Sequence, residues 1–151
     1  MRDMPDRYVR PGWMTTHAFN RIVAGLTRLG VSVLDSRVLE VRGRTSGVPR
    51  RVPVNLLTFE GEHYLVAPRG ETQWVRNLRA SDGEGTLLLG RRREPFVAHE
   101  LEDDAKPPLL RAYLKRWKAE IGIFFQGVGA DAPDDELRRI APGYPVFRLS
   151  R

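Results

Sequence analysis

Residues 38–68 read VLEVRGRTSGVPRRVPVNLLTFEGEHYLVAP, and this stretch decides the fold. It is rich in Val, Leu, Thr and aromatic residues, which favour extended backbone. Two glycine-bearing turns, RTSG at 44–47 and Glu60-Gly61, divide it into three strand-like runs. Strands joined by such short turns pair with antiparallel neighbours, so the stretch predicts an antiparallel sheet.

The flanking sequence extends this sheet. Two runs over 86–101, with a bend at Gly90, predict a fourth and a fifth strand, and YPVFRLS at 144–150 predicts the last. Helices are expected over 18–29, 73–80 (with Thr72 as a cap), from Asp103 or Asp104 to about 121, and 133–140. Strands outnumber helices, so we predict an α+β fold, an antiparallel sheet curled into a barrel with flanking helices.

Length and composition set further bounds. A chain of 151 residues suits one domain, expected over 17–151 behind a polar N-terminal arm over 1–16. The absence of cysteine excludes a disulfide scaffold and fits a cytoplasmic location. No run approaches the roughly 18 apolar residues of a membrane span, although the apolar face of the helix over 18–29 leaves peripheral membrane contact open.

The formal net charge is +6, and 25 residues are Lys or Arg, of which only Lys106, Lys115 and Lys118 are lysines. This arginine excess is compatible with nucleic acid, an anionic membrane surface or an acidic small molecule. No nucleic-acid-binding motif is present, and aromatic residues do not alternate with the basic runs, so we expect no nucleic-acid partner.

Residues for protein-borne chemistry are sparse. His17, His63 and His99 are widely spaced and show no metal-ligand pattern, so we expect no metal site. No nucleophile or phosphate-loop motif is present. These absences favour a bound cofactor that supplies its own chemistry.

The turn GRTSGVPRRVPV at 43–54 is the strongest candidate for a binding site. Gly43 and Gly47 let backbone approach a ligand closely, and Thr45 and Ser46 add hydroxyl donors. Arg44 and Arg50 flank the turn and are able to reach one phosphate together. From these residues alone, an anion site and a turn with solvated charges both stay open.

This turn and the block YLVAPRGETQWVRNLRA at 64–80 together resemble the deazaflavin-dependent nitroreductase family. FNRIVAGLTRLG at 19–30 and YPVFRL at 144–149 are also similar to family segments, so the resemblance spans roughly 18–149. It implies a split β-barrel of the FMN-binding, flavin-reductase-like kind. It also implies the reduced deazaflavin coenzyme F-420 as hydride donor, with FMN as the alternative cofactor.

The resemblance further implies which residues hold the cofactor. The turn would bind its phosphate, Arg51 or Arg91–Arg93 its acidic tail, the following strand its ring, and the end of the third strand the ring's polar edge. Arg91–Arg93 is otherwise a solvated hairpin tip, and Trp74 otherwise a core anchor. The implied cofactor residues are Arg44, Thr45, Ser46, Gly47, Arg50, Arg51, Val52, Pro53, Val54, Asn55, Ala67, Pro68, Arg69, Gly70, Trp74 and Asn77.

The implied activity is hydride transfer to a small apolar acceptor such as a quinone, an enone or a nitroaromatic. Candidate walls of the acceptor pocket are Phe19, Tyr113, Phe124 and Phe125. No residue stands out as proton donor, so a non-catalytic protein that binds a cofactor or a hydrophobic ligand on the same fold is the alternative. We expect a monomer or a homodimer.

Overall fold

The computed structural model describes residues 36–151, so the predicted arm over 1–16 and the predicted helix over 18–29, with Phe19, lie outside the described residues. In chain order the elements are β1 (Ser36–Arg42), β2 (Pro49–Phe59), β3 (Glu62–Val66), α2 (Gln73–Ala80), β4 (Glu84–Leu89), β5 (Arg92–Glu100), the 3-10 turn η1 (Asp103–Ala105), α3 (Pro107–Ile121), η2 (Gly122–Phe124), α4 (Asp134–Ile140), η3 (Ala141–Gly143) and β6 (Val146–Ser150).

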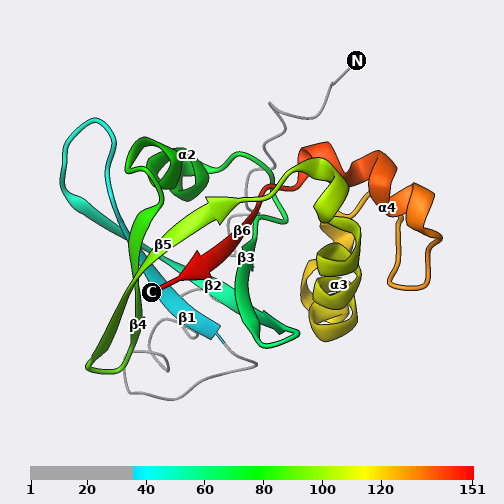
Figure 1. Cartoon of the computed structure of the whole chain (residues 1–151), viewed down its shortest axis with the longest axis horizontal. Helices are drawn as coiled ribbons and strands as arrows, with labels where there is room; N and C mark the ends of the chain where they lie inside the picture. Colours follow the sequence, from blue (N-terminus) through cyan, green and yellow to red (C-terminus); the bar gives the residue numbers. More distant parts are fainter. Residues whose placement is uncertain (1–35) are drawn as a thin grey trace.

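The six strands close into one antiparallel barrel in the order β1-β2-β3-β6-β5-β4, with β4 pairing back onto β1. The helices lie outside it (Figure 1): α2 at one end of the barrel, and α3 and α4 together on one side. The prediction of an α+β split barrel with flanking helices is therefore confirmed.

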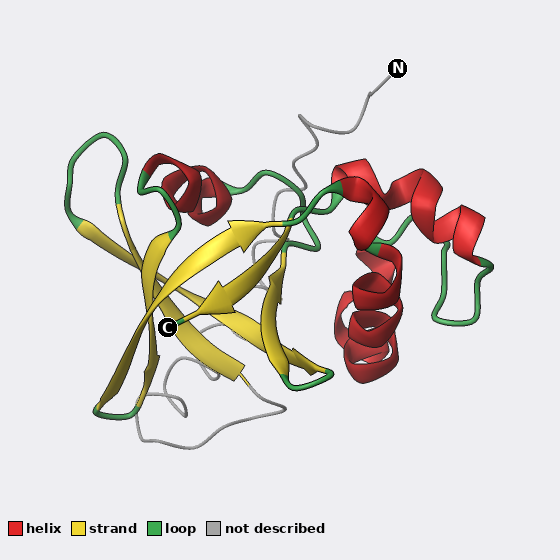
Figure 2. Cartoon of the chain, in the orientation of Figure 1, coloured by secondary structure: helices red, strands yellow, loops and turns green. Residues whose placement is uncertain are grey.

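The predicted turns join the strands as expected. Glu60 and Gly61 both have positive φ, 51° and 81°, at the tight turn between β2 and β3. Strands and turns alternate around the barrel in Figure 2. One boundary differs: Asp103 opens a short 3-10 turn, and α3 itself begins at Pro107, whose missing N–H is tolerated in the first turn of a helix.

The interior of the barrel is filled by apolar side chains from alternate strand positions, as the two-residue period of a strand requires. Leu39 on β1 and Leu65 on β3 are completely buried there. On α2, Val75 and Leu78 point into the same cluster, so this helix closes one end of the barrel. Because Val75 and Leu78 face the barrel, the opposite face of α2 is free to contact other parts of the chain or a ligand.

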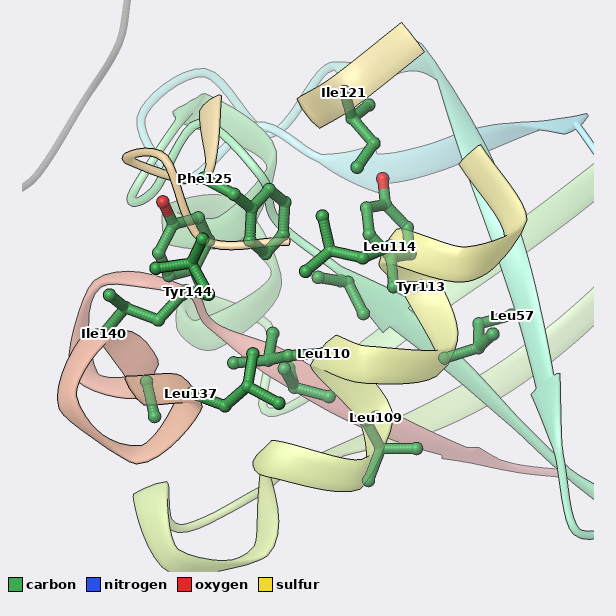
Figure 3. Close-up of a cluster of buried hydrophobic side chains, with 14 of the residues drawn as sticks. Leu57, Leu109, Leu110, Tyr113, Leu114, Ile121, Phe125, Leu137, Ile140 and Tyr144 are labelled. Carbon is green, nitrogen blue, oxygen red and sulfur yellow. The ribbon is translucent and has the colours of Figure 1, made fainter. Parts of the chain in front are cut away.

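A second apolar core lies outside the barrel, between α3, α4 and the outer face of β2, β3 and β6 (Figure 3). Leu57, Tyr64 and Val146 supply the strand side of this helical core. The rings of Phe125 and Tyr144 stack within it, with centroids 4.4 Å apart. No helix within residues 36–151 has the length and apolar character to cross a membrane.

Candidate functional site

An open cavity of about 610 Å³ lies between the β1–β2 turn and the N-terminal half of α2. Its walls come from the end of β1, the turn over 43–48, the start of β2, the loop between β3 and α2, and α2 itself. The lining residues are Val41, Gly43, Arg44, Thr45, Ser46, Arg50, Arg51, Val52, Arg69, Thr72, Gln73, Trp74 and Asn77.

The turn has its own hydrogen bonds. The Gly43 N–H donates to the Val48 carbonyl at 2.9 Å, and the Gly47 N–H donates to the Gly43 carbonyl at 2.9 Å. The Ser46 hydroxyl accepts a third bond, from the Val48 N–H at 3.1 Å. Gly47 adopts φ +75°, in the left-handed region that favours glycine. These contacts hold an exposed turn in one shape.

Asn77 connects the turn to α2. Its side-chain oxygen accepts two hydrogen bonds from Arg44, one from the backbone N–H at 3.1 Å and one from Nη1 at 2.7 Å. Asn77 is only 5 % exposed, so its amide is fixed by the packing of the helix around it. The helix therefore positions both the backbone and the guanidinium of Arg44 at the cavity wall.

The cavity is strongly cationic. Arg44, Arg50, Arg51 and Arg69 line it, and no Asp or Glu is among the described residues that do so. Arg44 and Arg50 are exposed, as an arginine that meets a soluble anion must be. Four guanidinium groups around one opening favour a ligand with several negative oxygens.

Arg51 is partly neutralised by Glu40. The Glu40 carboxylate accepts a hydrogen bond from Arg93 Nη2 at 2.7 Å and another from Arg51 Nε at 2.9 Å. These bonds, from Arg93 first and Arg51 second, lower the pKa of Glu40 below its ordinary value of 4.5. Glu40 therefore stays ionised and links β1 to β2 and to β5 beside the cavity.

One side of the cavity is apolar. Val41, Val52 and Trp74 form it, and Val52 and Trp74 also pack against the barrel core. The Trp74 ring lies 5.9 Å from the Phe147 ring, centroid to centroid. Trp74 is thus both a core anchor and a cavity wall, and the cavity suits a ligand with an apolar part and an anionic part.

The cavity brings together the predicted residues Arg44, Thr45, Ser46, Arg50, Arg51, Val52, Arg69, Trp74 and Asn77. Other predicted cofactor residues do not line it. They are Gly47, Pro53, Val54, Asn55, Ala67, Pro68 and Gly70.

The two groups that were expected along the ring and at its polar edge have other surroundings. Val54 packs against the barrel core, whereas Asn55 accepts a hydrogen bond from the Ser36 hydroxyl at 3.4 Å. The Ala67 N–H donates to the Pro145 carbonyl at 2.9 Å, and the Gly70 N–H donates to the Ala67 carbonyl at 3.2 Å. These two N–H groups are thus bonded to the protein's own backbone.

The predicted acceptor-pocket residues lie elsewhere. Tyr113 and Phe125 are buried in the helical core, and Phe124 packs against that core. None of the three lines the cavity. Their aromatic character is explained by packing between α3 and the barrel.

The sequence did not single out Val41, Gln73 or Thr72 as site residues. Thr72 occupies the predicted N-cap position of α2, but its side chain makes no capping hydrogen bond. The signal that was available for Thr72 and Gln73 was their position directly before Trp74, at the start of a helix that faces the cationic turn.

Comparison with known proteins agrees with this geometry. The sequence pattern of the family described as F420H(2)-dependent quinone reductase matches residues 13–122. No curated protein matches the chain significantly.

Solved structures share the fold. An F420-H2-dependent reductase (FDR-A) has a TM-score of 0.50 at 20% identity, over 77% of this chain and 94% of that one. A structure described as a domain-swapped dimer has a TM-score of 0.53 at 22% identity, over 91% of this chain and 97% of that one. Atu2129 from Agrobacterium tumefaciens, of unknown function, has a TM-score of 0.52 at 18% identity, over 96% of this chain and 57% of that one.

At these identities the structural likeness shows the fold, whereas the family pattern covers well over half of the chain. The chain therefore belongs to the F420H(2)-dependent quinone reductase family, and it is an oxidoreductase whose hydride-donating cofactor is F420H2.

Proposed function

We propose that the arginine-lined cavity holds the anionic part of F420 and that the enzyme reduces a small apolar acceptor of the quinone class. The observation that carries this proposal is the charge of the cavity: Arg44, Arg50, Arg51 and Arg69 line it without a lining carboxylate among the described residues. F420 carries a phosphodiester and an acidic tail, so its charge is complementary to such a wall.

Each part of the cavity has a separate task in this proposal. Arg44 and Arg50, with the hydroxyl of Thr45, would hold the phosphodiester. Asn77 would not touch the cofactor but would orient Arg44, to which it is bonded twice. The apolar wall of Val52 and Trp74 would cover the uncharged part of the cofactor next to the phosphodiester.

Other predicted contacts extend the proposal beyond the cavity. We propose that the cofactor extends beyond the cavity, where it would contact Gly47, the β2 residues Pro53 and Asn55, and the segment 67–70. Arg51, already bonded to Glu40, has a weaker claim on the acidic tail than Arg50 has on the phosphate, since Glu40 neutralises part of its charge.

The bound cofactor supplies the hydride, and the chain's residues bind, orient and exclude water. The family description favours quinones as acceptors, whereas enones and nitroaromatics are the alternative classes. Tyr113, Phe124 and Phe125 have no role in this proposal because they pack in the helical core.

A fluorescence titration with F420 and with FMN tests cofactor choice, and anaerobic oxidation of F420H2 by menadione, a cyclic enone and a nitroaromatic tests the acceptor. We expect tight binding of F420, weak binding of FMN and fastest turnover with menadione. F420 binding without oxidation by any acceptor would support the non-catalytic alternative, and protein that retains FMN through purification would contradict the cofactor assignment.

We also propose that the protein works as a monomer or homodimer. One of the similar structures is a domain-swapped dimer, which favours the homodimer. Light scattering behind gel filtration measures the mass directly, and a mass of one chain of 17.2 kDa would contradict the dimer.

A further inference from the structure

The side chain of Thr72 is buried at the cavity without a hydrogen-bond partner. The residue is 4 % exposed, and none of the described residues bonds its hydroxyl oxygen. A buried hydroxyl is ordinarily satisfied, because leaving it unpaired removes its bonds to water without replacing them. The Thr72 hydroxyl therefore requires an explanation that the fold of residues 36–151 does not supply.

Capping of α2 is not that explanation. Threonine at an N-cap ordinarily accepts a bond from an N–H in the first turn, but the Thr72 side chain makes none. Its backbone is well bonded: its N–H donates to the Gly70 carbonyl at 2.9 Å, and its carbonyl accepts from the Arg76 N–H at 3.2 Å. These backbone bonds hold Thr72 in place at the cavity wall.

The surroundings of Thr72 favour an anionic oxygen as that atom. Thr72 stands at the N-terminus of an eight-residue helix, whose dipole presents partial positive charge there, and the first turn of α2 has no acidic residue. Arg44 and Arg69 line the same cavity. A hydroxyl among these positive groups is suited to donate its proton to a phosphate oxygen.

We propose that the Thr72 hydroxyl donates a hydrogen bond to a phosphodiester oxygen of F420 and so contributes to the choice of the phosphorylated cofactor. This inference rests on the proposed function, because it needs F420 in the cavity. It adds a contact from the N-cap of α2 to those from the glycine turn, so the phosphate would be held from both sides of the cavity.

The test compares Thr72→Val with Thr72→Ser and the wild type in two titrations. One ligand is F420, and the other is the ribityl deazaflavin that lacks the phosphate and the acidic tail. We expect Thr72→Val to weaken F420 binding about ten- to a hundredfold, the range for losing a hydrogen bond to a charged oxygen. Binding of the phosphate-free ligand should change little, and Thr72→Ser should keep most of the wild-type affinity.

Thr86→Val on β4, away from the cavity, is the matched control and should bind F420 as the wild type does. The melting temperature of Thr72→Val should equal or exceed that of the wild type, because an unpaired buried hydroxyl is removed. A lower melting temperature would mean that the hydroxyl bonds other atoms of the chain, and would overturn the inference.

The other possible results of the two titrations also test the proposed contact. If the wild type binds F420 and Thr72→Val binds it with equal affinity, the Thr72 contact alone would be overturned. Equal loss for both ligands would place the hydroxyl at the deazaflavin ring and overturn the phosphate assignment. A wild type that binds neither ligand would overturn the proposed function and this inference with it.

Discussion

The side-chain oxygen of Asn77 accepts both the backbone N–H and the Nη1 of Arg44, at 3.1 and 2.7 Å. The two residues are 33 positions apart in the chain, so this pair joins a helix to a turn that are distant in sequence. Because the amide is buried and the guanidinium is exposed, the buried residue positions the exposed one.

Replacing Asn77 by Ala should weaken F420 binding about tenfold and destabilise the fold by about 1–3 kcal/mol. The binding loss follows from a misplaced Arg44, and the stability loss from removing the acceptor of the part-buried Arg44 N–H. Denaturant unfolding measures the second effect, and the F420 titration in stabilising buffer measures the first.

A double-mutant cycle with Arg44→Ala shows whether the two effects share one cause. If Asn77 acts through the guanidinium of Arg44, Asn77→Ala should lower F420 affinity much less in the Arg44→Ala background. Additive losses would instead mean that Asn77 contacts the cofactor itself.

Removing both exposed arginines of the turn tests the phosphate assignment. Arg44→Ala with Arg50→Ala should lower F420 affinity at least about tenfold while the melting temperature stays close to that of the wild type. Wild-type affinity should also fall as salt rises, since screening acts over about 8 Å at physiological ionic strength.

The control for charge is Arg138→Ala with Arg139→Ala on α4. It removes the same number of exposed positive charges from a part of the chain that does not line the cavity. An affinity loss as large in this variant would point to net charge, not to a site, as the source of F420 binding.

The fold could be predicted because its signals are local. The helix over 73–80 was predicted at the bounds that the structure has, and each predicted strand within the described residues was found. Turn glycines and apolar periodicity report on neighbouring residues, and they need no knowledge of the rest of the chain.

The site was predicted less completely because it depends on distant contacts. Nothing near Asn77 in the sequence indicates that it bonds a residue of the first hairpin turn, and nothing near Glu40 indicates Arg93, 53 residues away. Phe125 was predicted to line the acceptor pocket, but the sequence alone does not distinguish an aromatic residue that lines a pocket from one that packs in a core. In the structure Phe125 is buried and stacks on Tyr144, a contact that depends on how the segment before β6 packs.

Gly61 and Gly83 have nearly equal positive φ but different surroundings. Alanine substitutions at the two positions therefore distinguish the cost of backbone strain from the cost of steric crowding. Gly61 has φ +81° and open space where a Cβ would stand. Gly83 has φ +85°, and a Cβ there would overlap the carbonyl oxygen of Ala98, whose N–H donates to the Gly83 carbonyl at 2.7 Å. Gly61→Ala should therefore cost about 1–2 kcal/mol of left-handed strain alone.

Gly83→Ala should cost that strain and roughly 1–3 kcal/mol more, as overpacking does elsewhere. Urea unfolding of both variants provides the comparison. Equal free energies of unfolding would mean that β5 moves away from Gly83 without loss, contrary to the tight contact at Ala98.

Glu40 should give the unfolding free energy a pH dependence in the acid range. Its pKa is lowered in the folded state by the bonds from Arg93 and Arg51, so the stabilisation is complete above the unfolded pKa near 4.5 and is lost as the pH falls through the lower folded value. Glu40→Gln removes this charge while keeping the shape. The variant should be less stable than the wild type by on the order of 1 kcal/mol at pH 7, because both arginines are largely solvated.

The difference should shrink below pH 4.5 and vanish once the wild-type carboxylate is protonated. Unfolding by urea at a series of pH values measures it, with Glu136→Gln, whose arginine partner lies on the exposed face of α4, as the control. A difference that stays constant with pH would show that Glu40 acts by packing and not by charge. In that case Glu40 would not limit the contact of Arg51 with the acidic tail of F420, and the reason for ranking Arg51 below Arg50 would be lost.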